Sequence, residues 1–248
     1  MSAGAAEARR ALDQNPVWYH AIELAPGVVT PGQIDLRAAA ARVLPDDLSG
    51  LRALDVGTFD GFWAFEMERR GADVVAIDVD RVEAAEGPPI ARARLEREAG
   101  ERGVDLGRGF ELAAAALGSR AERRTVSVYD LTADRIGGPV DFAFSGAILL
   151  HLRDPVRALE RIRGALADGA ELRLLEPFSP RLTLLGPRRP AAGFRAAIEG
   201  FDWWLPNLAA LGAWLRAAGL REERRLAVVR PPVSEGLRHW QAAYAARR

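Results

Sequence analysis

Short apolar runs and longer amphipathic stretches alternate along this chain from about residue 45 onward. Runs such as LRALDV, VVAI and FAF are typical of strands that are buried on both faces of a sheet. The pattern predicts six strands, at residues 51–56, 73–78, 124–129, 140–145, 171–175 and 226–230. Between them it predicts helices at residues 60–70, 89–101, 109–118, 155–166 and 207–218. This alternation indicates a Rossmann-like α/β fold with a mainly parallel sheet and helices on both faces.

The remaining segments depart from this alternation. Residues 1–44 are predicted to form a cap on the main domain at 45–248, with helices at 3–14 and 35–43. Between these helices, residues 16–34 hold aromatic side chains and two PG pairs, which suit an ordered lid or a short hairpin. The proline-rich and glycine-rich segment at about 177–205 is expected to be an insertion after the fifth strand. The Ala-rich pattern of residues 237–247 suits a seventh strand or a last helix and does not decide between them.

Composition narrows the classes of protein. The chain has 248 residues and a net charge of zero, with 34 basic residues that are all Arg. A protein whose main task is to grip nucleic acid usually carries excess positive charge, so a nucleic-acid partner is disfavoured. The absence of Cys and Lys excludes thiolate chemistry, Cys-ligated zinc and a lysine Schiff base. With no signal peptide at the N-terminus and no apolar run of membrane-spanning length, we expect a cytoplasmic protein.

The first predicted strand leads into the segment LDVGTFDGF, which resembles a ligand-binding loop. Gly57 and Gly61 allow close approach to a ligand, but Phe59 stands where a dinucleotide fingerprint requires a second glycine. The loop therefore disfavours NAD and FAD and suits S-adenosylmethionine, which has no phosphate. We expect Asp55 to serve the ammonium of this cofactor, and the N–H groups of the loop, which includes Thr58, to serve its carboxylate.

Two further strand ends supply acidic residues. Asp78 lies 21 residues beyond Gly57, close to the spacing expected for a carboxylate on a ribose diol. Asp130 is expected to face the adenine, with Tyr129 packed nearby. At the end of the fourth strand, Ser145 and Gly146 complete the predicted cofactor set. One strand-ending acid is an ordinary feature of an α/β sheet, but three of them converge on the crevice where such sheets bind ligands.

These segments resemble the motifs of class I S-adenosylmethionine-dependent methyltransferases. LDVGTFDGFWAFEMERRGADVVAIDVD is similar to the first two motifs, and SVYDL and DFAFSGAILLHLRDPVRALERIRGALADGAELRLLEPF to the later ones. WYHAIELAPGVVTPGQIDL and WWLPNLAALGAWLRAAGL resemble the subgroup of wobble-uridine tRNA methyltransferases and carboxymethyltransferases, many of which act on small molecules. The resemblance covers about residues 16–230 and implies a seven-stranded sheet. Leu150 replaces the Tyr of the carboxymethyl-transferring enzymes and the chain lacks their Lys, so ordinary methyl transfer is favoured.

An acceptor nucleophile that is protonated at neutral pH benefits from a general base, for which the chain offers two histidines. His20 lies in the aromatic N-terminal segment, and His151 follows the fourth strand at the edge where the cofactor is expected. A purely structural role is the alternative for both. The predicted substrate contacts are Trp18, Tyr19, Arg153, Trp203 and Trp204, with core packing or a surface ion pair as their alternatives. No cluster has clear metal-ligand spacing, so no metal is expected.

The leading hypothesis is methyl transfer to an oxygen or nitrogen of a small-molecule acceptor in specialised metabolism. A tRNA-modifying enzyme of the same fold is the first alternative. A non-catalytic binding module is the second, and the intact set of Asp55, Gly57, Asp78 and Asp130 disfavours it. An NAD-dependent oxidoreductase ranks last because the glycine pattern is wrong. The sequence leaves open the identity of the acceptor, the atom methylated and the oligomeric state.

Overall fold

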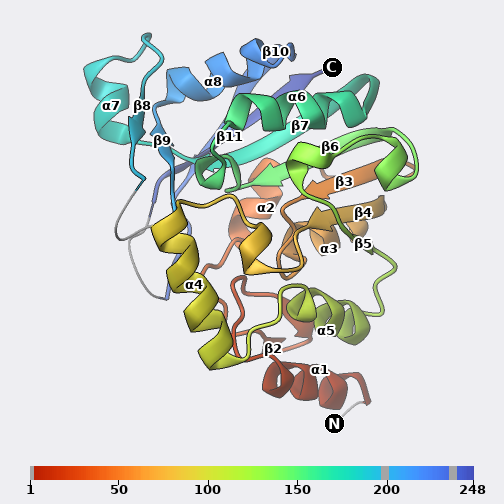
Figure 1. The fold of residues 1–248 in the computed structure, drawn as a ribbon. Helices are drawn as coiled ribbons and strands as arrows, with labels where there is room; N and C mark the ends of the chain where they lie inside the picture. The colour runs from red at the N-terminus through yellow and green to blue at the C-terminus, as the bar shows by residue number, and fades with distance from the viewer. Residues whose placement is uncertain (1–2, 197–200, 235–238) are drawn as a thin grey trace.

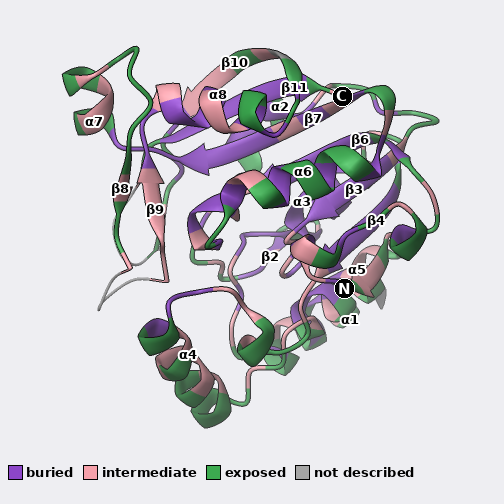
Figure 2. Cartoon of the chain, turned by 45° about the horizontal axis from the view of Figure 1, so that its top comes forward, coloured by how far each residue is buried: buried purple, intermediate pink, exposed green. Residues whose placement is uncertain are grey.

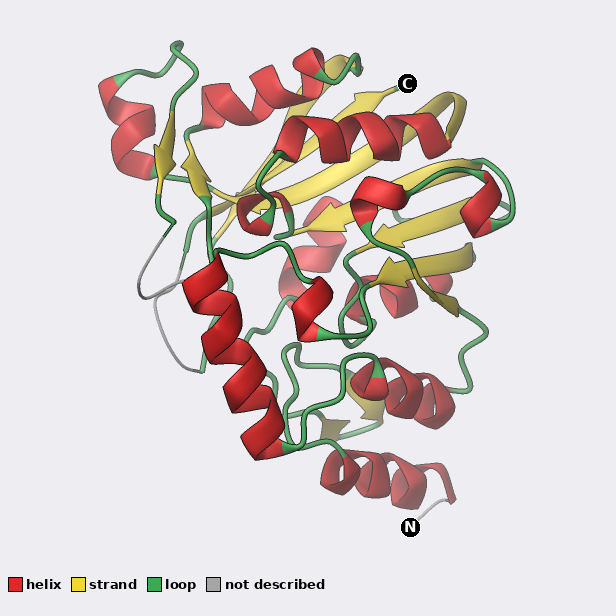
Figure 3. Cartoon of the chain, in the orientation of Figure 1, coloured by secondary structure: helices red, strands yellow, loops and turns green. Residues whose placement is uncertain are grey.

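The structure, a computed structural model, describes residues 3–196, 201–234 and 239–248. Its centre is a seven-stranded sheet with the order β10-β11-β7-β6-β3-β4-β5 (Figures 1 and 3). Five neighbouring strands run parallel, and β11 runs antiparallel to both β7 and β10. The strands are β3 Arg52–Val56, β4 Asp73–Asp78, β5 Glu122–Thr125, β6 Val140–Gly146, β7 Leu166–Pro177, β10 Arg221–Val229 and β11 Gln241–Arg247. The predicted Rossmann-like α/β fold is confirmed.

Side chains alternate between the two faces of the sheet, and each face carries its own apolar core. Ala53 of β3 packs on the face of α2 Arg37–Val43 and α3 Phe62–Glu68, while the next residue, Leu54, packs on the opposite face. That opposite face is covered by α6 Pro155–Ala165 and α8 Leu208–Ala217, which lie in front of the sheet in Figure 1. The inner strands β3, β4, β6, β7 and β11 are the most continuously buried elements, as Figure 2 shows. Burial on both faces explains why the strands read as apolar runs in the sequence.

Local sequence signals define where the two covering helices begin. Asp154 and Asn207 occupy the N-cap positions, and their side chains accept hydrogen bonds from the backbone N–H groups of Arg157 and Ala210. Each such cap stabilises a helix by about 1 kcal/mol. Pro155 then takes the first position of α6, where the missing N–H group costs nothing.

The N-terminal segment lies beside the carboxyl ends of the parallel strands. It contains α1 Ala3–Gln14, a small hairpin of β1 Glu23–Ala25 and β2 Val28–Val29, and then α2. Ile34 bridges His20 on one side and Val233 on the other, so the segment is tied to the connection before β11. The short hairpin predicted for residues 16–34 is therefore present, and α1 packs on α5 Arg108–Leu117.

Two other regions surround the carboxyl ends of the strands. Helix α4 Pro89–Arg102 stands away from the sheet with only Ala91 buried among its residues (Figure 2). The segment after β7 forms α7 Pro180–Leu185, β8 Ala192–Phe194 and β9 Trp204–Pro206, in the region of the predicted insertion. Residues 197–200 of that insertion lie outside the described residues. Within the described part of the chain, no helix is long and apolar enough to cross a membrane.

Two strand predictions were wrong in position. The third strand was predicted at 124–129 but is β5 Glu122–Thr125, and residues Val128–Asp130 form a 3-10 helix instead. The sixth was predicted at 226–230, yet β10 begins at Arg221. Both are edge strands of the sheet, so neither needs the apolar run that marks a buried strand. The undecided segment at 237–247 contains a strand, β11.

Candidate active site

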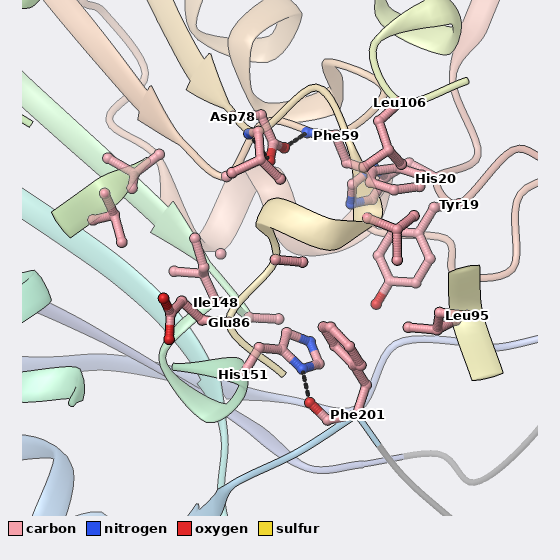
Figure 4. Close-up of a pocket in the computed structure, with 18 of the residues that line it drawn as sticks. Tyr19, His20, Phe59, Asp78, Glu86, Leu95, Leu106, Ile148, His151 and Phe201 are labelled. Atoms are coloured by element: carbon pink, nitrogen blue, oxygen red, sulfur yellow. Dashed lines mark hydrogen bonds between the residues drawn. The ribbon is translucent and has the colours of Figure 1, made fainter. Parts of the chain in front are cut away.

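A cavity of about 550 Å³ opens at the carboxyl ends of β3, β4 and β6, between the N-terminal segment, α4 and the insertion. Most of its lining is apolar. The N-terminal segment contributes Val17, Tyr19, His20, Gln33, Ile34 and Leu36. The sheet and its loops contribute Val56, Gly57, Phe59, Ile77, Asp78, Val126, Ser127, Val128, Gly146, Ile148, His151 and Leu175, and the α4 region contributes Leu95, Glu98, Ala99, Arg102, Val104 and Leu106. Figure 4 shows part of this lining.

The loop between β3 and α3 forms the floor of the cavity beside Asp78. Gly57 has a φ of +75°, and a Cβ atom there would lie 2.5 Å from Cδ1 of Ile148. Gly61 has a φ of +93°, so both glycines are required by the backbone. The N–H groups of Gly57 and Thr58 donate to the carbonyl of Ile77. These two N–H groups are therefore already engaged within the protein, and the carboxylate contact expected of the loop stays a prediction for its other N–H groups.

Asp78 lies at the end of β4 and lines the cavity, as predicted. One carboxylate oxygen accepts from the N–H of Phe59 at 2.7 Å (Figure 4), and the other accepts from the N–H of Val79 at 2.7 Å. Each oxygen retains a second lone pair that can accept from a hydroxyl. Burial raises the pKa of this carboxyl above its usual value. The arrangement suits a ribose diol.

Three predicted cofactor residues, Thr58 of this loop, Asp55 of β3 and Ser145 of β6, are buried and do not line the cavity. Asp55, Thr58 and Ser145 are at most 1% exposed, and their side-chain oxygens have no hydrogen-bond partner among the described residues. Burial raises the pKa of Asp55 to about 7. An unpartnered buried carboxylate is costly unless a cation or donor reaches it. A ligand ammonium near the loop would meet that need.

At the adenine end the structure does not bring Asp130 to the cavity. Ser127 and Val128 line it instead. The Ser127 hydroxyl accepts from the N–H of Tyr129 at 3.3 Å, which starts the 3-10 helix and leaves Asp130 exposed. Tyr129 is half-buried, and its hydroxyl accepts from the N–H of Asp154 at 2.8 Å. The sequence prediction missed Ser127 and Val128 because it extended the strand too far.

His20 reaches the cavity from the N-terminal segment and is held by Asp60. Asp60 is 1% exposed and follows Phe59 in the loop. Its Oδ2 accepts from the backbone N–H groups of Tyr19 and His20, both at 2.9 Å, while its Oδ1 contacts Nδ1 of His20. The imidazole also stacks on Phe62 at 5.5 Å between ring centroids. The sequence analysis assigned no role to Asp60, because its partner His20 lies forty residues earlier in the chain.

Tyr19 lies beside His20, with its hydroxyl turned into the cavity (Figure 4). Burial and the nearby carboxylate of Asp60 raise the pKa of Tyr19 to about 12. The hydroxyl therefore stays neutral and can donate a hydrogen bond to a ligand. Its neighbour Trp18 is 3% exposed and does not line the cavity, so the structure gives it a packing position.

His151 lines the cavity on the opposite side from His20. Its Nδ1 donates to the carbonyl of Phe201 at 2.8 Å (Figure 4). The same nitrogen lies 3.5 Å from the carboxylate of Asp202. Burial lowers the pKa of this imidazole. His20 and His151 thus reach one cavity, but with different partners.

The other predicted substrate contacts, Arg153, Trp203 and Trp204, are not among the residues that line the cavity. The indole N–H of Trp203 donates to the carbonyl of Glu86 at 2.6 Å, and the guanidinium of Arg153 lies 4.9 Å from the centre of the Trp203 ring. The Trp204 indole donates to the carbonyl of Arg153 at 3.2 Å. These side chains hold the insertion in place. The described residues contain no group of three His, Asp or Glu side chains that could hold a metal ion.

Comparison with known proteins identifies the family of the chain. A family model described as a methyltransferase domain matches residues 33–223. The chain is 30% identical over 188 residues to a tRNA U34 carboxymethyltransferase of Pseudomonas fluorescens, covering 74% of this chain and 50% of that protein. The chain therefore spans about half the length of this relative.

Two solved structures share the fold. A protein of Methanosarcina mazei described as a SAM-dependent methyltransferase has a TM-score of 0.54 at 19% identity, covering 86% of this chain and 98% of the other. The second is the 1,6-didemethyltoxoflavin-N1-methyltransferase of Burkholderia thailandensis, solved with 1,6-didemethyltoxoflavin and S-adenosylhomocysteine bound. It has a TM-score of 0.52 at 20% identity, covering 86% of this chain and 77% of the other. This chain belongs to the methyltransferase domain family. The resemblance seen in the sequence is confirmed, and S-adenosylmethionine is the cofactor that the family and the site indicate.

The residues present fit this cofactor. The unpartnered carboxylate of Asp55 suits its ammonium, Gly57 leaves the cradle open beside Ile148, and Asp78 suits the ribose. When bound, the cofactor supplies a methyl group already activated by the positive sulfur.

Proposed function

We propose that this chain transfers a methyl group from S-adenosylmethionine to an oxygen or nitrogen of a small-molecule acceptor. The observation that carries the proposal is the cavity of about 550 Å³ that runs from the cofactor loop to the N-terminal segment. A volume of this size and a mainly apolar lining with a few polar groups are typical of small-ligand sites. His20, Tyr19 and Gln33 are polar groups that the N-terminal segment contributes to this lining.

The tasks left to the protein are to align the acceptor, exclude water and accept a proton. The apolar side chains of Ile34, Leu36, Leu95 and Leu106 suit the first two tasks. Tyr19 is placed to donate a hydrogen bond to the acceptor. His20 is our candidate for the proton acceptor, because it combines a place on the cavity wall with a fixed orientation.

We further propose that the group transferred is an ordinary methyl rather than a carboxymethyl. A carboxymethyl group carries a negative charge that the site would have to neutralise. Arg102 is the one Arg in the lining formed by described residues, and it lies at the end of α4 near Glu98. The chain has no Lys, and Leu150 is buried at the position where the carboxymethyl-transferring relatives have Tyr.

A tRNA acceptor is the second candidate, because the relative from Pseudomonas fluorescens is described as acting on tRNA. One feature of this chain favours it. Arg181, Arg188, Arg189 and Arg195 are all exposed on the insertion, and residues 178–196 contain no Asp or Glu. Against it stands the zero net charge of the whole chain.

Binding to bulk tRNA across a salt series distinguishes the two candidates. We expect weak binding, with a Kd of about 10⁻⁶ M or weaker at physiological salt, as for non-specific contacts. The matched control is the quadruple variant Arg181→Ser, Arg188→Ser, Arg189→Ser and Arg195→Ser. This variant should bind tRNA even more weakly than the wild-type protein. Tight binding that falls steeply with salt and disappears in the control variant would favour the tRNA candidate.

A further inference from the structure

Among the described residues, every side-chain hydrogen bond of Asp60 goes to Tyr19 or His20, about forty residues earlier in the chain. It lies in the cofactor loop between Phe59, with a φ of +49°, and Gly61, with a φ of +93°. Yet its carboxylate turns away from the loop and binds the backbone of Tyr19 and His20 and the ring of His20. A left-handed residue on each side gives the loop the sharp turn that directs this side chain to the N-terminal segment.

We infer that Asp60 is a positioning residue, which holds His20 with its proton on Nδ1 and leaves Nε2 free to take the proton of the acceptor. This inference rests on the proposed function, since it assigns the means by which the same site activates its acceptor. Asp60 itself does not touch the cofactor or the acceptor. It acts through the imidazole.

The hydrogen bonds to Asp60 determine the tautomer. An ionised carboxylate only accepts hydrogen bonds, and Oδ2 of Asp60 is already occupied by two backbone N–H groups. The ring nitrogen that faces Oδ1 must therefore carry a proton. Nε2 has no hydrogen-bond partner among the described residues, and the ring lines the cavity. Nε2 is thus the basic nitrogen that a ligand meets.

Packing fixes the plane of the ring as well as its tautomer. Phe62 stacks on one side with an interplanar angle of 26°, and Tyr19 meets the ring edge-on at 77°. A base whose orientation is fixed in advance loses little entropy when the acceptor arrives. The acceptor then gives its proton to Nε2, and its freed electron pair bonds to the methyl carbon. The bond from that carbon to sulfur breaks, and its electron pair stays on sulfur.

The same loop also joins the two halves of the site. Phe59 donates its N–H to Asp78, which faces the cofactor, while the next residue, Asp60, holds the candidate base. The Nδ1 of His151 donates to a backbone carbonyl, which fixes the same tautomer. Its nearby carboxylate, Asp202, lies 3.5 Å away and within 4.0 Å of Arg195 as well, whereas Asp60 contacts the His20 ring directly and can stabilise the positive charge that the ring gains. The geometry therefore favours His20 over His151 as the proton acceptor.

Nitrogen NMR of the histidine rings tests the inference without a known acceptor. The chain contains three His residues, so ¹⁵N labelling gives three ring systems, which His20→Gln, His151→Gln and His239→Gln assign one by one. At a pH where the rings are neutral, we expect His20 to carry its proton on Nδ1. A proton on Nε2 of His20 in the wild-type protein would overturn the inference.

Asp60→Asn supplies the second test. Its amide can keep its oxygen on the backbone N–H groups and turn its NH₂ group towards Nδ1, so His20 should switch to the Nε2 proton. With an acceptor in hand, the rate should fall by roughly 10²–10⁴-fold while the affinity for S-adenosylhomocysteine stays within about threefold. Asp202→Asn is the matched control and should change the His151 signals alone. Unchanged His20 signals in folded Asp60→Asn would contradict the role of Asp60.

Calorimetry with S-adenosylhomocysteine separates this inference from the proposed function. If the wild-type protein binds this ligand but His20 shows the wrong tautomer, the inference about Asp60 fails and the proposed function stands. If the folded protein does not bind it, the proposed function fails whatever the tautomer.

Discussion

The buried carboxylate of Asp55 destabilises the ligand-free protein, and a bound cation can offset this destabilisation. The residue is fully buried, and neither carboxylate oxygen has a hydrogen-bond partner within 3.5 Å among the described residues. Burial raises its pKa to about 7, although the Thr58 side chain, His20 and the Ala64 backbone act in the opposite direction. The folded protein therefore holds this proton more tightly than the unfolded chain, where the pKa is about 3.9. Stability must then fall as the pH rises from about 4 to about 7. A cation bound beside Asp55 reverses this penalty.

Asp55→Asn should stabilise the ligand-free protein and weaken ligand binding together. The amide cannot ionise, so the gain should be larger at pH 8 than at pH 5, by a few kcal/mol at most, since each pKa unit corresponds to about 1.4 kcal/mol. Affinity for S-adenosylhomocysteine should fall because its ammonium loses an anionic partner. Denaturant unfolding at the two pH values and calorimetry measure the two effects. A variant less stable than wild type at pH 8 would show that the carboxylate has a partner we have not recognised.

The N-terminal segment is the element on which the proposed acceptor site depends. It places Tyr19 and His20 on the cavity wall, and the Thr30 hydroxyl links its two arms by donating to the carbonyl of His20 at 2.6 Å and accepting from the N–H of Ile22 at 2.7 Å. Gly32 packs against the same turn so closely that a Cβ atom would lie 2.1 Å from the carbonyl carbon of His20. A side chain at position 32 would therefore displace the backbone of His20.

Gly32→Ala should displace this element and leave the cofactor end of the site intact. We expect a loss of about 1–3 kcal/mol in the free energy of unfolding and a shift of the His20 ring signals. Affinity for S-adenosylhomocysteine should stay within about threefold. Gly164→Ala, in a helix with open space around it, is the control and should gain about 0.5–1 kcal/mol. If Gly32→Ala behaves like that control, the segment is less tightly packed than the structure indicates.

At the scale of the whole molecule, the sequence predicts the buried parts well and the edges poorly. β3, β4 and β6 were predicted to within a residue because their side chains are buried on both faces of the sheet. The edge strand β5 has the sequence ERRT, which carries no apolar signal, and the apolar VSV after it packs around a 3-10 helix instead. The Ala-rich segment of β11 is a strand because β7 and β10 pair with it on both sides.

The candidate site was predictable where chain order alone sets the position of a residue. Gly57 and Asp78 follow directly from the ends of two buried strands. Asp130 was misplaced together with the edge strand before it. Asp60 was not recognised because its partner is set by how the N-terminal segment folds back, which no local pattern encodes. Long-range contacts of this kind require the structure.

The most direct test of the whole account follows a radiolabelled methyl group from S-adenosylmethionine. The protein is incubated in parallel with a small-molecule extract of its source organism and with bulk tRNA. We predict label in a low-mass product with the wild-type protein and with Asp130→Ala, and loss of at least tenfold with Asp78→Ala, which removes a carboxylate from the cavity wall. Label in tRNA instead of a low-mass product would contradict the small-molecule assignment.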